Sequence, residues 1–587
     1  MDMQTRRAVS EHHFITHDGV DLFYRHWPAI GERRGAVVMF HRGHEHSGRL
    51  AHLVDELGLS EFDFFAWDAR GHGHSPGERG FSPSLGTSVR DVQTFMHHIR
   101  DRHGIEQQDI AVLAQSVGAV LISTWAHDYA PQVRALVLAS PAFKVKLYVP
   151  LARPGLRLLH RLRGDFFVNS YVKSRYLTHD TQRQAEFDND PLITRAISVK
   201  LLLDLYATAE RVVTDAAAIT IPTQLLISGA DWVVDRKPQD DFFDRLGAVV
   251  KEKHLLEGFY HDTLGEAGRE RAVRLARDFI LRQFDAPAAA VDLSSADRMG
   301  YTFDEAQSLA KPLYGSRFKS WWWKAYRQGL NLAGRFSDGI ALGHRTGFDS
   351  GSSLDYVYRN RPGGSGPIGR LIDRNYLNAI GWRGIRQRKC HLQELISQAL
   401  DKLRENDRPL RVLDIAAGHG RYVLDALATG NVQAERVLLR DFSDSNVRDG
   451  RKLIQERGVG EWTRFEQGDA FDTASVAGAL PGTTLGIVSG LYELFPDNDR
   501  VRASLAGMAQ AIEVGGYLIY TGQPWHPQLE MIARALTSHR DGRAWVMRRR
   551  TQAEMDQLVR ESGFEKIEQR IDEWGIFTVS LARRVAA

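Results

Sequence analysis

The stretch AVLAQSVGAV, residues 111–120, decides the fold of the first half of the chain, because a serine lies where an apolar run gives way to a helical pattern. A nucleophilic serine on such a strand-to-helix turn has strained backbone dihedrals and needs small residues two positions before and after it. Gly118 and Ala119 meet this need on one side, whereas Ala114 replaces the first glycine of Gly-x-Ser-x-Gly. Alanine adds only a methyl group, so the pattern predicts that Ser116 lies on a turn of this type. The motif alone is weak evidence for catalysis.

Apolar runs of strand length alternate with helical patterns through the first half of the chain. This alternation predicts a parallel sheet with crossover helices. Between about 143 and 218 the strand-like runs give way to an Arg- and Leu-rich, mostly helical insertion, which we expect to form a cap. The strand-like runs are residues 35–41, 63–68, 109–116, 133–140 and 223–229.

A second alternation follows a segment rich in Ala, Pro, Asp and Ser that ends near residue 295. Apolar runs recur from 409 to 584 and share no repeat with the first half. A chain of 587 residues is expected to form two or three domains. The sequence therefore predicts an α/β protein with one domain over 1–285, a linker and helical, aromatic extension over 286–384, and a second domain over 385–587.

Composition and charge are ordinary for a globular protein and limit its partners. A net charge of +3 demands neither nucleic acid nor a strongly acidic partner. The single cysteine, Cys390, excludes an internal disulfide framework and a multi-cysteine zinc site, and we expect it to be a small core residue. The N-terminus has no apolar run of signal-peptide length, which predicts a cytoplasmic protein.

Two basic segments leave a peripheral membrane contact open as a partner. Residues 149–164 and 317–335 mix basic residues with Leu or Trp in a roughly helical rhythm, as interfacial helices do. The simpler expectation is that their apolar faces pack on a domain. No uncharged apolar stretch of about 18 residues occurs, so no membrane-spanning helix is expected.

Two further residues complete a predicted catalytic triad with Ser116. Asp231 follows the apolar run that ends at 229, and His261 lies in a loop further along, which is the chain order of α/β-hydrolases. His261 would take the proton of the Ser116 hydroxyl, and Asp231 would fix the imidazole tautomer. Asp235 is a rival for the role of the acid, although it lies four residues further from the strand end.

Five blocks of the first half resemble the monoglyceride lipase, lysophospholipase and serine aminopeptidase-like group of α/β-hydrolases. They are HRGHEHSGR (41–49), DARGHGHSPGERG (68–80), AQSVGA (114–119), SGADWVVD (228–235) and GFYHD (258–262). The similarity spans about 12 to 285. It implies a nucleophile, its two partners and two oxyanion donors, which are Ser116, Asp231, His261, Gly43 and Val117. The Leu-, Val-, Tyr- and Phe-rich cap favours an acyl or other apolar ester as substrate.

One departure from this group affects the oxyanion loop. Arg42 stands where the group usually has a glycine, which puts the shape of the loop in question. Closely spaced histidines in the same blocks could also ligate zinc. Because both clusters lie in the loop blocks of the resemblance, we expect no metal at His41, His44, His46, His72 and His74.

The stretch RVLDIAAGHGRYVLDAL, residues 411–427, decides the second half. An apolar run leads to Asp414, a turn of small residues with Gly418 and Gly420, and a helical pattern. Small residues let a bound nucleoside approach the backbone, although Ala416 replaces the first glycine of the usual Gly-x-Gly-x-Gly. A dinucleotide site and an S-adenosylmethionine site both fit this loop.

The order of the later blocks separates these two interpretations. Asp441 ends the next predicted strand, where a carboxylate can accept hydrogen bonds from ribose hydroxyls. FEQGDAFD (465–472), GIVSGLYELFPD (486–497) and VGGYLIYTGQPW (514–525) follow, and the series resembles class I S-adenosylmethionine-dependent methyltransferases over about 385–585. The resemblance implies S-adenosyl-L-methionine as the cofactor, bound by Asp414, Ala416, Gly418, Gly420, Asp441, Asp469 and Ala470.

The methyl acceptor is less well defined by the sequence. Loops at the carboxyl ends of the strands are the place to expect its pocket. The candidates are Tyr492, Glu493, Trp525, His526 and the aromatic, basic region 321–389. No Asn/Asp-Pro-Pro-Tyr block occurs, and the basic run 538–550 is expected to be a solvated helix face, so a nucleic-acid partner is not expected.

These expectations combine into one bifunctional protein. We expect an α/β-hydrolase domain with a helical cap, followed by a Rossmann-like class I methyltransferase domain. Its reactions would be hydrolysis of an acyl ester by a serine hydrolase and methyl transfer to a small or lipid-derived acceptor. The alternative is a methyltransferase, of RNA for example, that carries a non-catalytic lipid- or membrane-binding hydrolase-like module. The oligomeric state is left open.

Overall fold

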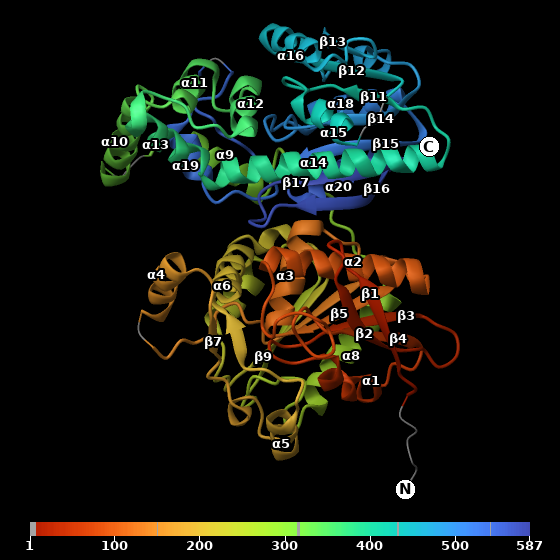
Figure 1. The fold of residues 1–587 in the computed structure, drawn as a ribbon. Coiled ribbons are helices and arrows are strands. Elements are labelled where there is room, and N and C mark those ends of the chain that lie inside the picture. The colour runs from red at the N-terminus through yellow and green to blue at the C-terminus, as the bar shows by residue number, and fades with distance from the viewer. Residues whose placement is uncertain (1–6, 150, 314–316, 431–433, 541, 587) are drawn as a thin grey trace. The chain divides into compact units, whose positions relative to one another are not determined.

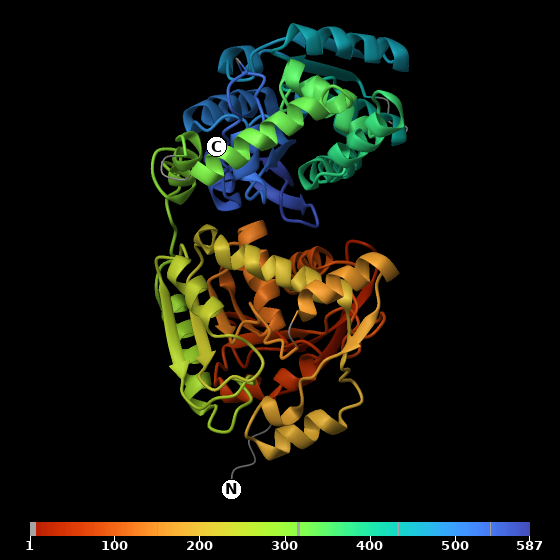
Figure 2. The same ribbon diagram turned by 90° about the vertical axis from the view of Figure 1, so that its left-hand side faces the viewer.

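The computed structural model describes residues 7–149, 151–313, 317–430, 434–540 and 542–586. The chain separates into two compact units, Met1–Val291 and Asp292–Ala587, each built round its own sheet. Two views at right angles show helices on both faces of each sheet (Figures 1 and 2). The predicted two-domain α/β class is therefore confirmed.

The first unit contains an eight-stranded sheet in the order β1-β2-β4-β3-β5-β6-β9-β10. Strand β2 is antiparallel to both of its neighbours, and the strands from β4 to β10 are parallel. Parallel strands place their carboxyl ends at one edge, where loops that carry a site can meet. The strands are β1 (Ser10–Ile15), β2 (Asp21–Trp27), β3 (Gly35–Phe40), β4 (Phe62–Trp67), β5 (Ile110–Gln115), β6 (Ala135–Ala139), β9 (Thr223–Ser228) and β10 (Lys251–Leu256).

Helices pack on this sheet, and the cap interrupts it between β6 and β9. The packing helices include α1 (His52–Glu56), α2 (Leu85–His103), α3 (Val117–Tyr129), α7 (Lys237–Arg245) and α8 (Glu270–Asp285). The cap is mostly helical, with α4 (Ala152–Arg163), α5 (Thr181–Asn189) and α6 (Val199–Thr214). It also contains a short antiparallel pair that the sequence pattern did not indicate, β7 (Phe167–Asn169) and β8 (Ala196–Ser198).

The second unit contains a seven-stranded sheet in the order β13-β12-β11-β14-β15-β17-β16. The strands from β13 to β15 are parallel, and β17 is antiparallel to both of its neighbours. After β11 the chain forms β12 and β13 on one side of it and then returns to form β14 on the other side. This reversal creates a switch point, the place at which ligands bind in open α/β sheets. The strands are β11 (Arg411–Asp414), β12 (Arg436–Asp441), β13 (Thr463–Gln467), β14 (Thr483–Val488), β15 (Ile512–Gly522), β16 (Phe564–Ile571) and β17 (Thr578–Arg584).

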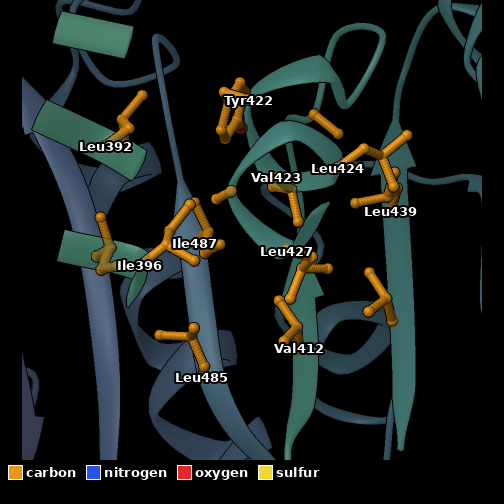
Figure 3. Packing of buried hydrophobic residues seen from close by; sticks show 14 of the residues in the cluster. Leu392, Ile396, Val412, Tyr422, Val423, Leu424, Leu427, Leu439, Leu485 and Ile487 are labelled. Carbon is orange, nitrogen blue, oxygen red and sulfur yellow. The ribbon is translucent and has the colours of Figure 1, made fainter. Parts of the chain in front are cut away.

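The long helix α14 (Ile380–Glu405) shows how this sheet is covered. Its buried residues follow helical spacing, so that one face meets the sheet: Leu392, Leu395, Ile396, Ala399, Leu400 and Leu403. Figure 3 shows Leu392 and Ile396 beside Ile487 of β14 in one apolar cluster. Helix α15 (Arg421–Thr429) contributes to the same cluster, together with α16 (Asp444–Arg457). The other helices packed on the sheet include α17 (Thr473–Ala477), α18 (Asn498–Ala511) and α20 (Gln552–Glu561).

A group of helices precedes α14 in the chain and extends the second unit. They are α9 (Tyr301–Ala310), α10 (Arg317–Ala333), α11 (Asp338–Thr346), α12 (Gly351–Arg359) and α13 (Gly366–Leu377), and α19 (Leu529–Ala535) packs against α9 and α10. Together with parts of α14 they enclose a second apolar cluster. None of the helices in the described part of the chain combines the length and apolar character needed to cross a membrane. The cytoplasmic location stays a prediction.

Candidate functional site

Ser116 lies on the predicted strand-to-helix turn, between β5 and α3. Its φ of 56° and ψ of −116° are values that residues other than glycine rarely adopt. The tight packing of the turn is at Gly118, where a Cβ atom would lie 2.5 Å from the His41 carbonyl oxygen. Ala114 is fully buried in the regular strand β5 and has no comparable restriction. The turn therefore forms without a glycine at position 114.

The three predicted triad residues meet at this turn. His261 Nε2 is 2.7 Å from Ser116 Oγ, and His261 Nδ1 is 2.8 Å from Asp231 Oδ2. The amides of Val233 and Val234 donate to Asp231 Oδ1 at 2.7 and 2.9 Å. These bonds fix the carboxylate so that its other oxygen faces the imidazole.

The electrostatics of Asp231 fit a group that stays ionised beside an imidazole. Burial opposes ionisation of Asp231, but the charge of His261 and the hydrogen bonds to the carboxylate outweigh burial and hold its pKa below the ordinary value. The rival acid Asp235 instead forms an ion pair with Lys144 at 2.8 Å. The structure therefore brings Asp231 to the histidine.

Gly43 and Val117, the expected oxyanion donors, lie next to each other at the cavity that contains Ser116. Val117 is the first residue of α3, so its N–H has no acceptor within the helix. A Cβ atom added at Gly43 would lie 3.1 Å from Val117 Cγ2, so the two residues are in close contact. Both line the cavity that also contains Ser116 and His261.

Arg42 points into the protein and joins a buried ion-pair network. Its Nε donates to Glu45 at 3.0 Å, and its Nη2 lies 3.4 Å from Asp262 Oδ2. Asp262 also accepts a hydrogen bond from Arg183 Nη2 at 3.1 Å. Burial opposes the charge on Asp262, but the two guanidinium groups outweigh it and keep its pKa far below the ordinary value. Sequence reasoning missed this network because its members lie far apart in the chain.

The histidines of the loop blocks have protein partners. His41 Nδ1 donates to the Arg42 carbonyl at 2.6 Å, and His41 Nε2 accepts from the Ala69 amide at 3.1 Å. His46 Nε2 is 2.9 Å from Asp190 Oδ2, and His72 Nδ1 donates to the Arg70 carbonyl at 2.8 Å. These contacts give the three rings structural roles in the loops.

A cavity of about 610 Å³ opens above Ser116. The cap supplies much of its apolar lining, including Leu151, Leu156, Leu159, Leu202 and Leu205. Ser116 and His261 line the same cavity. The arrangement can hold an apolar chain with its ester carbonyl next to the serine hydroxyl.

The glycine-containing loop of the second unit follows β11. Gly418 and Gly420 have φ values of 58° and 73°, and a Cβ atom at Gly420 would lie 2.4 Å from Leu439 Cδ1. Asp414 is fully buried, and its carboxylate accepts hydrogen bonds from the Tyr422 hydroxyl at 2.5 Å and the Ala416 amide at 3.3 Å. Burial raises the pKa of Asp414 to about 7. Asp414 thus supports the loop from within the sheet.

Asp441 holds the same loop from the end of β12. Its Oδ2 accepts from the Gly418 amide at 2.9 Å, while Oδ1 accepts from the Ser443 amide at 2.9 Å and from Asn446 Nδ2 at 3.0 Å. A carboxylate has about four acceptor sites, so Oδ2 can accept one further hydrogen bond. This capacity fits a ribose hydroxyl.

The end of β13 offers the remaining features of a nucleoside site. Asp469 is exposed, and its Oδ1 accepts from the Phe471 amide at 2.9 Å, whereas Ala470 is buried. Phe442, directly after Asp441, is 74% exposed and offers a flat apolar surface for a base. Sequence reasoning missed Phe442, although an aromatic residue after a strand-ending acid was a visible signal.

A second cavity of about 350 Å³ lies at the carboxyl ends of β14 and β15. Glu493 and His526 line it, as two of the acceptor candidates were expected to. Glu493 Oε1 lies 3.4 Å from Arg388 Nη1, while its buried Oε2 has no hydrogen-bond partner among the described residues. His526 Nδ1 accepts from the Gln528 amide at 3.0 Å, and burial lowers the pKa of His526 to about 4. The ring is therefore neutral near pH 7.

The other acceptor candidates have different positions. The Tyr492 side chain is buried, and its hydroxyl donates to Ser504 Oγ at 3.1 Å. Trp525 packs against an apolar cluster instead of lining the cavity. From the region 321–389, the lining includes Tyr326, Tyr376, Trp382, Ile385 and Arg388.

Two expectations about single segments are wrong, and a third is met only in part. The run 538–550 is no solvated helix face: its described residues form no helix, and Arg548, Arg549 and Arg550 are buried. Arg548 donates to Glu554 Oε1 at 2.8 Å, so its charge is neutralised within the protein. Cys390 is exposed instead of lying in the core. The expectation that the apolar faces of 149–164 and 317–335 pack on a domain holds only in part: Leu330 packs against an apolar cluster, whereas both helices also expose large apolar side chains.

Comparisons with known proteins agree with this division of the chain. Residues 276–584 match the family described as "Putative methyltransferase", and residues 31–268 match "Serine aminopeptidase, S33". "Uncharacterized protein YnbC" of Escherichia coli (strain K12) is 59% identical over 584 residues, which is 99% of this chain and 100% of that protein.

Relatives of the first unit alone are more distant. The "Monoacylglycerol lipase" of Mycolicibacterium smegmatis is 25% identical over 264 residues, which is 44% of this chain and 91% of that protein. Among solved structures, the monoacylglycerol lipase of Paleococcus ferrophilus matches with 23% identity and a TM-score of 0.41, over 45% of this chain and 99% of that one.

Proposed function

The chain belongs to the family described as "Putative methyltransferase" and carries an S33-type α/β-hydrolase unit before it, and on this premise we propose that it is a bifunctional enzyme. Its first unit would hydrolyse an acyl ester with a serine nucleophile. Its second unit would transfer a methyl group from S-adenosylmethionine to a small or lipid-derived acceptor. The hydrogen-bonded chain from Ser116 through His261 to Asp231, at one end of an apolar cavity, carries the proposal.

The hydrolase reaction follows from the contacts of the triad. Ser116 Oγ attacks the ester carbonyl while His261 Nε2 takes its proton, and the Gly43 and Val117 amides stabilise the resulting oxyanion. His261 then gives the proton to the departing alcohol, leaving an acyl group on Ser116. A water molecule, deprotonated by His261, releases the acid. Asp231 keeps Nδ1 protonated, so that Nε2 is free to accept the proton.

The apolar cavity supports an acyl ester as the substrate class. Leucine side chains of the cap have no hydrogen-bonding groups with which to recognise a sugar or a peptide backbone. They do provide a surface from which an acyl chain displaces water, worth about 0.8 kcal/mol for each buried methylene group. The proposed substrate is therefore an ester with at least one extended apolar chain.

The residues of the second unit fit S-adenosylmethionine. Asp441 would accept a hydrogen bond from a ribose hydroxyl, and Asp469 and Phe442 would contact the adenine. When bound, the cofactor supplies an electrophilic methyl group. Glu493 would orient the acceptor and take its proton, because it lines the cavity and its buried Oε2 has no hydrogen-bond partner among the described residues.

A labelling experiment tests the hydrolase proposal. A fluorophosphonate probe is expected to modify the full chain at Ser116, with the adduct mapped by peptide mass spectrometry, and Ser116→Ala should abolish it. Ester hydrolysis should be lost in parallel. Absence of labelling in the folded wild-type protein would favour the alternative of a non-catalytic binding module.

A binding experiment tests the cofactor site separately. Equilibrium dialysis with labelled S-adenosylmethionine should show saturable binding, and Asp441→Asn should weaken it by at least about tenfold, because the amide cannot accept all the bonds that the carboxylate accepts. Asp444→Asn, an exposed change in the next helix, serves as the matched control. Glu493→Gln should leave cofactor binding within about twofold while lowering methyl transfer by about 10²-fold. Equal binding by all variants would contradict the assignment.

A further inference from the structure

Helix α10 exposes an unusual set of side chains. None of its 17 residues is buried, although it carries three consecutive tryptophans. Phe318 is 73% exposed, Trp321 60%, Trp322 51% and Leu332 55%. Large aromatic side chains exposed together on one element mark an interaction site more often than single exposed residues do.

The exposed residues form one stripe along the helix. Phe318, Trp321, Trp322 and Leu332 follow the spacing i, i+3, i+4 and i+14, which places them on one side of the helix, with the small residues Ala325 and Gly329 between them. Tyr326 and Leu330 lie further round the helix and line the second cavity. Helix α10 therefore has one apolar face on its own unit and another toward solvent.

The charge of the helix indicates what covers the solvent-facing stripe. Residues 317–335 contain five basic residues and no acidic ones. Arg317 and Lys324 border the apolar stripe, where long basic side chains can extend toward anionic headgroups. A second copy of the same helix would bring like charges together. The charge therefore complements an anionic lipid surface and opposes self-association through this face.

We propose that α10 is an interfacial helix that binds the second unit to an anionic lipid bilayer, with Trp321 and Trp322 at the level of the headgroups. Tryptophan suits this depth because its ring is apolar while its N–H can bond to water or phosphate. The helix is too short and too basic to span the bilayer. It would lie in the plane of the interface.

One consequence concerns the source of the methyl acceptor and rests on the proposed function. Because Tyr326 and Leu330 of the same helix line the cavity with Glu493, a helix bound to the bilayer would place that cavity beside the lipid. A lipid-derived acceptor could then enter with its apolar part leading. Vesicle binding is measured without cofactor, so its failure and the failure of methyl transfer are distinguishable.

Co-sedimentation of the full-length protein with vesicles tests the proposal. Vesicles of phosphatidylcholine alone are compared with vesicles containing about one third phosphatidylglycerol. The wild-type protein should bind the anionic vesicles, and the double variant Trp321→Ser, Trp322→Ser should bind at least about tenfold more weakly. Brominated lipids should quench tryptophan fluorescence in the wild type, and the double variant should lose most of that quenching. Circular dichroism checks that the variant is folded, as expected for exposed positions.

Helix α4 provides the matched control. Its Leu158 and Leu162 are also exposed on a basic helix, but α4 belongs to the cap and its neighbouring residues line the ester cavity. Leu158→Ser, Leu162→Ser should leave vesicle binding within about twofold, a difference small against the tenfold expected for α10. Wild-type binding by the α10 variant, or equal binding of the two vesicle types, would overturn the proposal. A change in oligomeric state caused by the α10 variant, without a change in vesicle binding, would assign the stripe to a second copy of the chain.

Discussion

Replacing Asp231 by asparagine is expected to disable the hydrolase while preserving its shape. The amides of Val233 and Val234 both donate to Oδ1, so the asparagine must keep its oxygen at that position. Its NH₂ group then faces His261 Nδ1 at the place of the carboxylate oxygen, 2.8 Å away. The imidazole must accept there and carry its proton on Nε2, where it can no longer take the proton of Ser116.

The expected loss follows from this tautomer. An asparagine in the equivalent role of a serine triad lowers kcat by about 10⁴-fold, which is about 5 kcal/mol of transition-state stabilisation. Hydrolysis of a p-nitrophenyl acyl ester by the full chain measures kcat and KM, and KM should change little because the apolar cavity is intact. The rate of fluorophosphonate labelling should fall in parallel.

Asp235→Asn is the matched control for this prediction. Asp235 lies four residues away and pairs with Lys144 outside the triad, so kcat should stay within about twofold of the wild type. The reasoning is refuted if Asp231→Asn keeps more than about a tenth of the activity, a loss far smaller than a wrong tautomer requires. Loss of activity in Asp235→Asn instead would assign the acid to the rival residue.

Three further predictions follow from packing and charge. Gly118→Ala should destabilise the first unit by about 1–3 kcal/mol in denaturant unfolding, because the new Cβ would meet backbone oxygens, whereas Ala114→Gly should cost under about 1 kcal/mol. Between pH 3.8 and about 7 the folded chain holds a proton on Asp414 that the unfolded chain has lost. The contribution of Asp414 to the free energy of unfolding therefore falls as pH rises, by up to about 4 kcal/mol. Asp414→Asn, which imitates the protonated acid, should flatten this dependence in calorimetry at several pH values; an unchanged slope would contradict it. Arg42→Gly should lower the stability of the first unit by about 3 kcal/mol in thermal unfolding, because the buried carboxylates of Glu45 and Asp262 each lose one of their guanidinium partners; a neutral effect would show that the network is not stabilising.

Sequence patterns predicted the features that depend on neighbours in the chain. The turn at Ser116 needs only small residues close by, and the loop at Gly418 needs only a strand, small residues and a helix. Asp231 and His261 follow parallel strands of the first sheet, and Asp441 ends a parallel strand of the second sheet, so their order along the chain was informative. These residues lie where such reasoning expected them.

Features that depend on distant partners could not be predicted in this way. Arg548 appeared in a basic run that suited solvent, yet it is buried because Glu554 and Asn498 approach it in the folded unit. The aromatic spacing of α10 is the same whether the stripe faces a core or solvent. Whether Cys390 is buried or exposed likewise depends on which face of α14 meets the sheet, and Cys390 lies on an exposed face. Periodicity gives the faces of a helix and leaves open what each face meets.

The presence of arginine at position 42, where the hydrolase group usually has a glycine, can be understood from the two loops that Arg42 connects. A glycine leaves an oxyanion loop free to adopt its shape, whereas a buried arginine must be paired. Arg42 directly precedes Gly43, and its partner Asp262 directly follows His261. The ion pair therefore links the loop of the proposed oxyanion donor to the loop of the proposed general base. Under the proposed mechanism, arginine at this position replaces the conformational freedom of glycine by a link between two groups that would act on the same carbonyl.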